Sequence, residues 1–290
     1  MIDIIDNAVM TIMPLALFFL MLTLGLKLTI KNFTDIIRMP RSFAVGMLNQ
    51  MIILPLVTFI VAILFGLEPI LAAGLVLAAL CPGGTTTSYV SKLAKGDVAL
   101  SILLTAIMSI LIVITIPIAL KFVMPYFMGG EAPSFSIVAL GIKMAAITAV
   151  PVSIGMTIHR FLPTFTVKIR PVIDRVAIGV FILSLVLSIR SIWTPFVDNL
   201  GIVGIPSVLI IAIMFYIGYK SPYWFGLEEP QARTVAIEAP YQNPIIAFTT
   251  AGIVYPSVTG GLSPFAAPAA VYAILALGVY VVVYFLWIRK

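Results

Sequence analysis

The chain has 290 residues, of which 62% are hydrophobic and 10% charged, and its mean hydropathy is +1.19. Soluble domains average about 25% charged residues, so this composition excludes a soluble globular protein and indicates an integral membrane protein. The net charge of +6 comes from short basic clusters between apolar runs, which is a signal of membrane topology and not of nucleic-acid binding.

Apolar runs of membrane-spanning length recur along the whole chain and predict an all-α protein with nine transmembrane helices in a single domain over residues 1–290. We place these spans at residues 9–30, 42–65, 70–95, 98–124, 136–159, 171–191, 199–219, 231–255 and 263–287. Of the 17 basic residues, all but Lys121, Lys143 and Arg190 then fall on one side of the membrane. The positive-inside rule puts that side in the cytoplasm. We therefore expect a multi-pass protein of the inner (plasma) membrane, with its amino terminus outside and its carboxyl terminus in the cytoplasm.

Two of the predicted spans are interrupted. Residues 79–89 of the third span read Ala-Leu-Cys-Pro-Gly-Gly-Thr-Thr-Thr-Ser-Tyr, and residues 238–244 of the eighth read Glu-Ala-Pro-Tyr-Gln-Asn-Pro. Proline opposes a continuous helix, so both segments predict broken helices whose second halves begin near Thr85 and Pro244. Spans 1 to 4 match spans 6 to 9 in order but cross in the opposite direction, which predicts inverted repeats. Interruptions at matching positions of such repeats indicate the binding site of a transporter.

Glu238, the acid inside the eighth span, is the strongest candidate for a functional residue. An acid at mid-bilayer costs roughly 2.5 to 3.5 kcal/mol, so it usually pairs with a proton, a cation or a basic side chain. Carboxylate, carbonyl, amide and hydroxyl oxygens bind small hard cations, and the two breaks supply all four kinds. Sodium is the natural candidate, and a proton remains an alternative. The free N–H groups at the amino ends of the second half-helices suit an anionic substrate.

Each of these features also has a purely structural explanation. Proline and glycine can simply kink transmembrane helices, and threonine and serine can bond back to their own helix. Gln50 is as consistent with contacts between helices as with a ligand role. Ser101 and Thr105, four residues apart on one helix face, are individually better explained as back-bonded hydroxyls. Two breaks at matched positions, one with an acid, favour the functional explanation.

At these residues the chain resembles the bile acid:sodium symporter family. The similarity runs over most of the chain, from Met21-Leu-Thr-Leu-Gly-Leu-Lys27 through Cys81-Pro-Gly-Gly-Thr85 and Leu93-Ala-Lys-Gly96 to Glu238 with Gln242-Asn243. The resemblance implies a core domain with two broken, crossing helices (about residues 42–124 and 199–287) and a smaller panel domain (about residues 9–30 and 136–191). The chain is similar to a bacterial member in a nine-span form.

The resemblance also implies two sodium sites and a substrate site. The first sodium site would use the side chains of Thr87, Ser88, Ser101, Thr105 and Glu238. The second would use Glu238, Gln50 and Gln242 with the backbone carbonyls of Ala239 and Tyr241. Substrate contacts are expected at Thr85, Thr86 and Asn243. Position 88 carries Ser where the family usually has Asn, which alters the first site, and Pro240 stands where Gly is usual.

We therefore expect a secondary active symporter that imports an organic anion with sodium by alternating access. The anion would be a small carboxylate, such as a keto acid or a pantoate-like acid, or a bile salt. The alternative is proton coupling with Glu238 as the proton carrier. An enzyme is not expected, because Asp97 and the pair Glu228 and Glu229 have no histidine beside them. A passive channel would not concentrate its substrate. The sequence leaves the oligomeric state open and is compatible with a monomer in the lipid bilayer.

Overall fold

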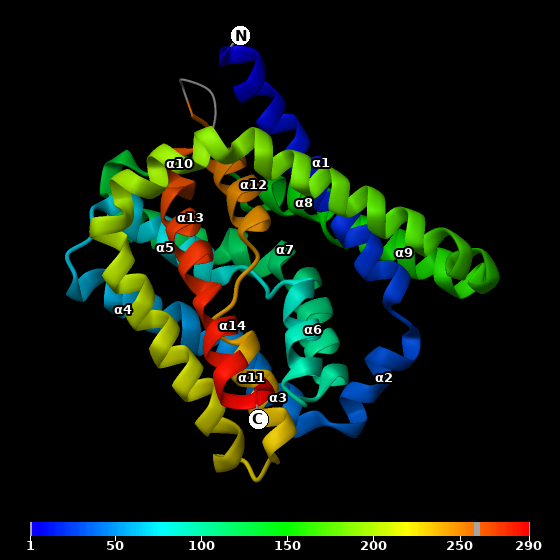
Figure 1. The fold of residues 1–290 in the computed structure, drawn as a ribbon. Helices are drawn as coiled ribbons and strands as arrows, with labels where there is room; N and C mark the ends of the chain where they lie inside the picture. The colour runs from blue at the N-terminus through cyan, green and yellow to red at the C-terminus, as the bar shows by residue number, and fades with distance from the viewer. Residues whose placement is uncertain (1, 258–261, 290) are drawn as a thin grey trace.

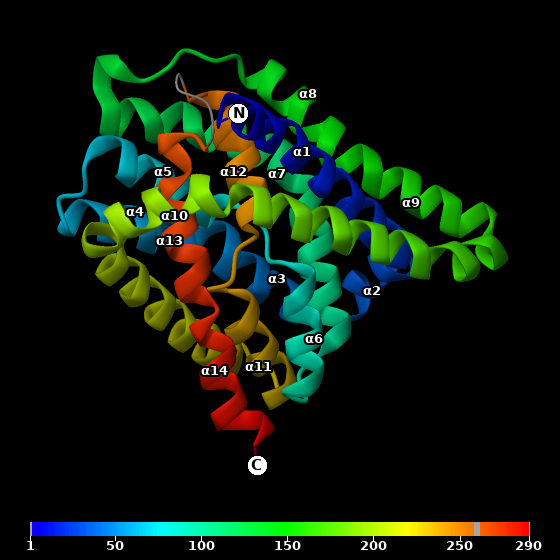
Figure 2. The same cartoon turned by 45° about the horizontal axis from the view of Figure 1, so that its top comes forward.

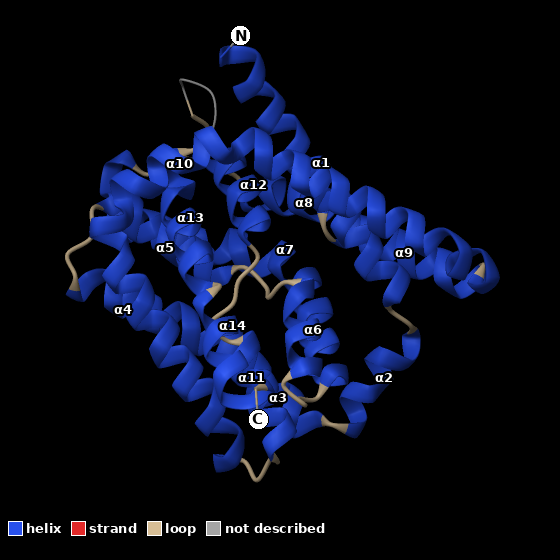
Figure 3. Ribbon diagram, viewed as in Figure 1, coloured by secondary structure: helices blue, strands red, loops and turns tan. Residues whose placement is uncertain are grey.

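A computed structural model describes the backbone of residues 2–257 and 262–289. It also describes most of their side chains, except those of residues 2–11, 35, 36, 85, 181, 184–192 and 195. Within these ranges all regular structure is helical and no strand occurs, as Figure 3 shows. The start of the first helix and the end of the last lie at opposite ends of the molecule (Figure 1). The prediction of an all-α protein is confirmed for this part of the chain.

Most helices follow the apolar runs of the sequence closely. Their bounds are α1 (Ile2–Lys27), α2 (Ile30–Arg38), α3 (Pro40–Leu48), η1 (Asn49–Ile53), α4 (Leu54–Leu64), α5 (Pro69–Leu80), α6 (Thr85–Leu93), α7 (Val98–Met128), η2 (Gly129–Glu131), α8 (Ile137–Ile147), α9 (Ala149–Phe161), α10 (Pro163–Trp224), α11 (Glu229–Glu238), α12 (Pro244–Val254), η3 (Pro264–Ala266), α13 (Ala267–Ala276), α14 (Gly278–Val283) and η4 (Tyr284–Ile288).

Five helical runs in the described part of the chain are long and apolar enough to cross a membrane. They are Pro40–Leu64, Val98–Glu131, Ile137–Phe161, Phe196–Trp224 and Pro264–Ile288. Shorter apolar helices occur at Ile12–Lys27, Pro69–Leu80 and Pro244–Val254. Each of the eight coincides with one of the predicted spans or with half of an interrupted one. The chain is therefore a multi-pass membrane protein.

Helix α10 differs from the prediction. The sequence predicts two spans with a connection at residues 192–198, whereas the structure has one helix of 62 residues from Pro163 to Trp224. This helix turns sharply along its course, so it has two arms that run in different directions (Figures 1 and 2). Residues 192–198 contain proline but no glycine, and a proline can bend a helix without ending it. The predicted connection is thus a bend within a helix and not a loop.

The two arms of α10 pack against different neighbours. In the first arm, Asp174 forms an ion pair with Lys27 of α1, with 3.3 Å between Lys27 Nζ and Asp174 Oδ1. In the second arm, Gly218 lies against α11 so closely that a Cβ atom there would be 2.9 Å from the carbonyl oxygen of Val235. Helices α1, α8, α9 and the first arm of α10 lie together along one side of the molecule in both views (Figures 1 and 2).

The two predicted breaks are present. Helix α5 ends at Leu80 and α6 begins at Thr85, while α11 ends at Glu238 and α12 begins at Pro244. The two connecting segments cross near the middle of the molecule (Figure 3). Because helix ends leave backbone groups without intrahelical partners, this crossing gathers free N–H and C=O groups in the interior.

Candidate functional site

The carboxylate of Glu238 lies at the crossing and is fully buried. Ser101 Oγ donates a hydrogen bond to Glu238 Oε1, and Thr105 Oγ1 approaches Oε2 at 3.5 Å. Gln50 Nε2 lies 3.4 Å from Oε2 and donates to the main-chain oxygen of Glu238 at 3.1 Å. Three residues on η1 and α7, each more than 130 positions from Glu238 in sequence, thus converge on this acid. None of the ion pairs between described residues includes Glu238.

Local structure explains how these partners reach Glu238. Ser101 and Thr105 are four residues apart on α7, so they share one helix face. Asp97 caps the start of α7 by accepting from the Leu100 N–H at 3.0 Å. Gln50 belongs to η1, a turn of π-helix inside the α3–α4 span, and such turns often occur at functional sites. The alternative that Ser101 is only a back-bonded hydroxyl does not hold in this structure.

Helix α6 supplies further hydroxyl groups. Ser88 Oγ lies 2.8 Å from Ser101 Oγ and can donate to it, since the Ser101 proton goes to the carboxylate, so Ser88 reaches the carboxylate through Ser101. Thr87 is buried and donates back to the Gly84 carbonyl at 2.5 Å. Thr86 is exposed, and its hydroxyl lies 3.0 Å from the hydroxyl of Tyr280. The predicted residue Thr85 begins α6, but its side chain lies outside the described part of the structure.

The second break contributes backbone carbonyls. Gln242 Nε2 donates to the Ala239 carbonyl at 3.2 Å, and the Tyr241 ring stacks on the Tyr280 ring with centroids 5.0 Å apart. Asn243 Oδ1 accepts from the Ile245 N–H at 3.0 Å and so caps the start of α12. The carbonyls of Ala239 and Tyr241 follow the buried acid directly in the chain. They lie beyond the end of α11, in the segment that connects α11 to α12.

Two acceptor oxygens near this site have no donor. Gln50 Oε1 and Gln242 Oε1 are buried and have no hydrogen-bond partner among the described residues. Each amide uses its nitrogen on a neighbouring carbonyl, which leaves its oxygen free. A buried polar atom without a partner costs about 1–3 kcal/mol, so it needs an explanation such as an unobserved ion or water. Unpaired oxygens beside a carboxylate without a basic partner fit the coordination of a small hard cation.

Three further residues shape the site, and the sequence interpretation did not select them. A Cβ atom on Gly83 would lie 2.5 Å from Glu238 Oε2, so only glycine lets the first break pass this close to the carboxylate. Tyr272 is fully buried, and its hydroxyl donates to the Pro240 carbonyl at 2.7 Å. Tyr280 contacts Thr86 and Tyr241. A usable signal was present, since a tyrosine inside an apolar span needs a partner for its hydroxyl.

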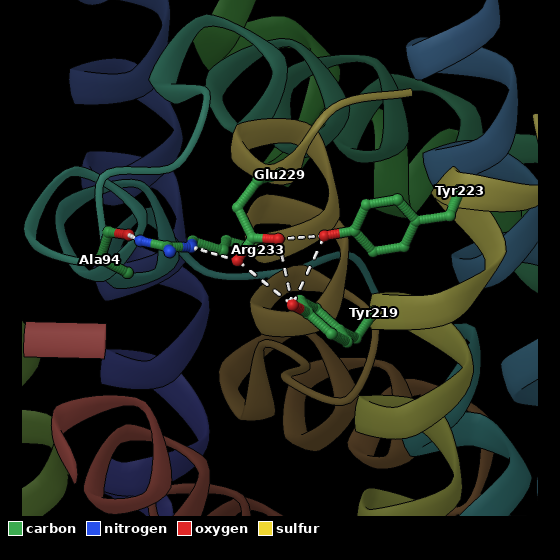
Figure 4. Close-up of polar contacts among 5 residues, drawn as sticks. All are labelled: Ala94, Tyr219, Tyr223, Glu229 and Arg233. Carbon is green, nitrogen blue, oxygen red and sulfur yellow. Dashed lines mark hydrogen bonds and ion pairs between the residues drawn. The ribbon is translucent and has the colours of Figure 1, made fainter. Parts of the chain in front are cut away.

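A polar cluster fixes the other end of α11 (Figure 4). Glu229 accepts hydrogen bonds from Tyr223 and from Tyr219, at 3.1 and 3.2 Å for the latter, and pairs with Arg233 at 2.9 Å. Arg233 Nη1 also donates to the Ala94 carbonyl at 2.8 Å, beyond the end of α6. The Tyr223 hydroxyl, followed by Arg233 and Tyr219, lowers the pKa of the Glu229 carboxyl below its ordinary value. This cluster ties α10, α11 and the end of α6 together.

Asp97 makes a second connection, between α11 and the loop that follows α6. Its N–H donates to the Pro230 carbonyl at 3.1 Å, and its carbonyl accepts from Thr234 Oγ1 at 3.1 Å. Gln231 Nε2 approaches its carboxylate at 3.3 Å. The loop between α6 and α7 is therefore held on α11, so the first half of one broken helix and the second half of the other are fastened together.

Comparisons with known proteins show the family to which the chain belongs. The family model described as the sodium bile acid symporter family matches residues 14–199. The chain is 29% identical over 233 residues to the probable sodium/metabolite cotransporter BASS2, chloroplastic, of Oryza sativa, and 30% identical over 234 residues to the BASS1 protein of Arabidopsis thaliana. Each alignment covers 80% of this chain, and 54% and 56% of the respective relative.

An animal protein is also similar. The ileal sodium/bile acid cotransporter of Oryctolagus cuniculus is 28% identical over 238 residues, which cover 80% of this chain and 67% of that protein. The chain thus spans a little over half of the length of the plant relatives and two thirds of the animal one. The names of these relatives share sodium and differ in the organic solute.

Proposed function

Since the chain belongs to the sodium bile acid symporter family, we propose that it is a sodium-coupled symporter that imports an organic anion. The observation that carries this proposal is the environment of Glu238. This buried acid has no basic partner among the described residues, it contacts the hydroxyls of Ser101 and Thr105 and the amide nitrogen of Gln50, and the amide oxygens of Gln50 and Gln242 lack donors. A bound cation supplies the missing positive charge and the missing partner for these oxygens.

Sodium is assigned to two sites that share Glu238. The first comprises the hydroxyls of Thr87, Ser88, Ser101 and Thr105 with the carboxylate. Ser101 and Thr105 support this site by contacting the carboxylate directly, and Ser88 supports it by contacting Ser101. Thr87 would have to rotate away from its bond to Gly84 in order to bind.

The second sodium site comprises Glu238, Gln50 and Gln242 with the carbonyls of Ala239 and Tyr241. The two unpaired amide oxygens support it most strongly. Gln50 Nε2 and Gln242 Nε2 now donate to the carbonyls of Glu238 and Ala239, and rotation of either amide would turn its oxygen toward an ion at the same place.

The organic anion is assigned to the amino ends of α6 and α12. Backbone N–H groups point out of both helix starts, and helix amino ends favour negative charge. Thr86 is exposed next to Tyr280, and Asn243 uses its side-chain oxygen as a cap, which leaves its amide N–H groups for the anion. Thr85 is included among the substrate-binding residues because it is the first residue of α6. We favour a small carboxylate over a bile salt, and the relatives named for metabolites support this choice.

Transport would proceed by movement between two groups of helices. The panel comprises α1, α8, α9 and the first arm of α10, and the remaining helices, with both breaks, form the core. The nine-span count with inverted repeats requires the two arms of α10 to act as two spans joined at the bend. Termini at opposite ends of the molecule support an odd number of crossings (Figure 1). The basic loops place the amino terminus outside and the carboxyl terminus in the cytoplasm.

Uptake into proteoliposomes tests the proposal. Labelled keto acid and labelled bile salt are supplied at fixed pH with sodium or with choline outside, and with or without an imposed pH gradient. We expect accumulation of the small carboxylate above its external concentration only with sodium. Undiminished uptake in choline that follows the pH gradient would instead establish proton coupling by Glu238. Uptake that never exceeds equilibration would establish a passive pathway.

A further inference from the structure

A cavity with a partly polar lining lies away from the helix crossing, where the connection between α1 and α2 meets the end of α9. Its volume is about 520 Å³, which is within the range of ligand pockets. Residues 28–31 form one wall and residues 153–161 of α9 form the other. No residue of α5, α6, α11 or α12 lines this cavity, so it is separate from the site proposed for sodium and the transported anion.

The polar wall of this cavity is basic. Lys31, His159 and Arg160 all line it, and none of the described residues that line it is acidic. Asp174, an acid of the neighbouring α10, is paired with Lys27 at 3.3 Å and with Arg170 at 3.8 Å. The charges on Lys31 and Arg160 therefore have no described acid in the cavity to neutralise them, and an anion would find a favourable potential there.

One hydrogen-bonding side chain of the cavity, that of His159, has a ring nitrogen without a partner among the described residues. The hydroxyls of Ser153 and Thr157 donate back to the carbonyls of Ala149 and Ser153, at 2.8 and 2.7 Å, as helix serines and threonines often do. His159 Nδ1 is buried and has no hydrogen-bond partner among the described residues. Either ring nitrogen of histidine can carry the proton, so Nδ1 can donate to an oxygen placed in the cavity.

The surroundings of the cavity are apolar and exposed. The Arg160 guanidinium lies 5.6 Å from the centre of the Phe161 ring, and that ring is 71% exposed. Ile30 on the opposite wall is 51% exposed, and Leu162 beyond α9 is 54% exposed. Basic groups next to exposed apolar side chains, at the ends of two spans predicted to face the cytoplasm, match the polar and apolar layers of a membrane interface.

We propose that this cavity binds a phosphate group, and the apolar margin indicates the headgroup of an anionic phospholipid as its source. Lys31 and Arg160 pair with the phosphate oxygens, His159 donates from Nδ1, and the acyl chains lie along Ile30 and Phe161. Basic pockets between transmembrane helices on the cytoplasmic side commonly bind anionic headgroups. The bound lipid would contact both α9 and the connection between α1 and α2, which joins two parts of the fold.

Binding measurements on the purified full chain in detergent test this inference. The probes are short-chain phosphatidylglycerol, short-chain phosphatidylcholine, glycerol phosphate and inorganic phosphate, each titrated while native mass spectrometry counts the bound molecules. We expect phosphatidylglycerol to bind and phosphatidylcholine to bind at least tenfold more weakly, since its headgroup has no net charge. Each basic residue near an anionic membrane surface is worth about 1 kcal/mol, so the double variant Lys31→Gln, Arg160→Gln should bind phosphatidylglycerol about thirtyfold more weakly.

The matched control is the double variant Lys92→Gln, Lys220→Gln, which removes two exposed charges outside the cavity and should bind like the unaltered protein. If the double variant Lys31→Gln, Arg160→Gln misfolds, Lys31→Gln alone serves as the test, because Lys31 is exposed. We expect this single variant to bind phosphatidylglycerol about fivefold more weakly. Tight binding of glycerol phosphate or inorganic phosphate with the same loss in the variants would assign the site to a soluble phosphate and overturn the lipid source. Equal binding of both lipids would overturn the assignment to an anionic headgroup, and equal loss in the control would overturn the phosphate site itself.

Discussion

The N–H of Asn243 donates a hydrogen bond of 2.8 Å to the carbonyl of Pro82. This bond joins the two helix breaks directly, because Pro82 lies between α5 and α6 and Asn243 lies between α11 and α12. Both groups are free only because the helices stop there. The crossing is therefore one unit, in which the position of the first break depends on the second, and a change in either should affect the site around Glu238.

Gly83→Ala tests this dependence. The added Cβ atom would lie 2.5 Å from Glu238 Oε2 and 3.7 Å from Gln50 Nε2, so the break or the carboxylate must move. We expect sodium-dependent uptake to fall at least tenfold while the protein still purifies as a folded species. Gly201→Ala is the control, because a Cβ atom there meets nothing within 4 Å, and uptake should be unchanged. Normal sodium affinity in Gly83→Ala would show that the carboxylate does not need its present position.

Glu238→Gln tests the central assignment. The substitution keeps the size of the side chain and removes its charge, so a sodium ion would lose its only charged ligand among the proposed ones. We expect the increase of melting temperature with sodium to disappear, together with sodium-dependent uptake. A Glu238→Gln protein that still needs sodium for uptake, with unchanged affinity, would refute the assignment.

Ser88→Ala should have a much smaller effect. Ser88 Oγ contacts the carboxylate only through Ser101, at 2.8 Å from the Ser101 hydroxyl. Loss of one neutral hydrogen bond is worth about 1 kcal/mol, so we expect sodium affinity to fall about fivefold. Ser101→Ala removes the direct contact and should weaken sodium binding more strongly. Isothermal titration with sodium compares the two variants, and the reverse order would place the first sodium site closer to Ser88 than to Ser101.

The unpaired amide oxygens give a prediction that separates binding from folding. Gln242→Met keeps the length of the side chain, removes the unpaired oxygen and deprives the Ala239 carbonyl of a donor. These two changes oppose each other, so the melting temperature without sodium should stay within a few degrees of the original. We expect the sodium-induced rise in melting temperature to be lost. An undiminished rise would remove Gln242 from the second sodium site.

Sequence reasoning singled out Glu238 and the two breaks as a candidate site because each of them has a strong local signal. An acid inside an apolar run, and proline with glycine at mid-span, are chemically expensive in a bilayer and point to Glu238 and to both breaks. Gln50 and Ser101 have no such local signal, and only the folded chain shows that they contact the carboxylate. The role of Gly83 could be recognised only from its distance to Glu238, since many glycines in membrane helices serve packing alone.

The missed features depend on backbone geometry and on tertiary contacts. Hydropathy cannot tell a loop from a bent helix, which is why residues 192–198 were predicted as a connection although α10 continues through them. The hydroxyl of Tyr272 inside an apolar span indicates that it needs a partner, but only the folded chain shows that this partner is the Pro240 carbonyl. The contacts of Asp97 with α11 join residues more than 130 positions apart, and no periodicity in the sequence reports them.

Glu229 provides a prediction about pH. Hydrogen bonds from Tyr223 and Tyr219, with the ion pair to Arg233, favour the charged carboxylate and lower its pKa from the ordinary value of 4.5. A group whose pKa is lowered by folding stabilises the fold above its unfolded pKa, and this contribution is lost as the pH falls through the folded value. Because the Glu229 side chain is 40% exposed, solvent screening limits the contribution to at most about 1 kcal/mol.

We therefore expect Glu229→Gln to lower the melting temperature in detergent at pH 7 and to have a smaller effect once the pH falls below 4.5, because the carboxylate of the unfolded chain then takes up a proton while the folded one still keeps its charge. Glu68→Gln is the control, since Glu68 precedes α5 without a side-chain cap bond and its substitution should not change the pH profile. The cluster also holds α11 on α10 and on the end of α6, so the variant should reduce the rate of transport more than sodium affinity. A difference in melting temperature that stays constant from pH 7 to pH 4 would mean that the charge of Glu229 does not stabilise the cluster.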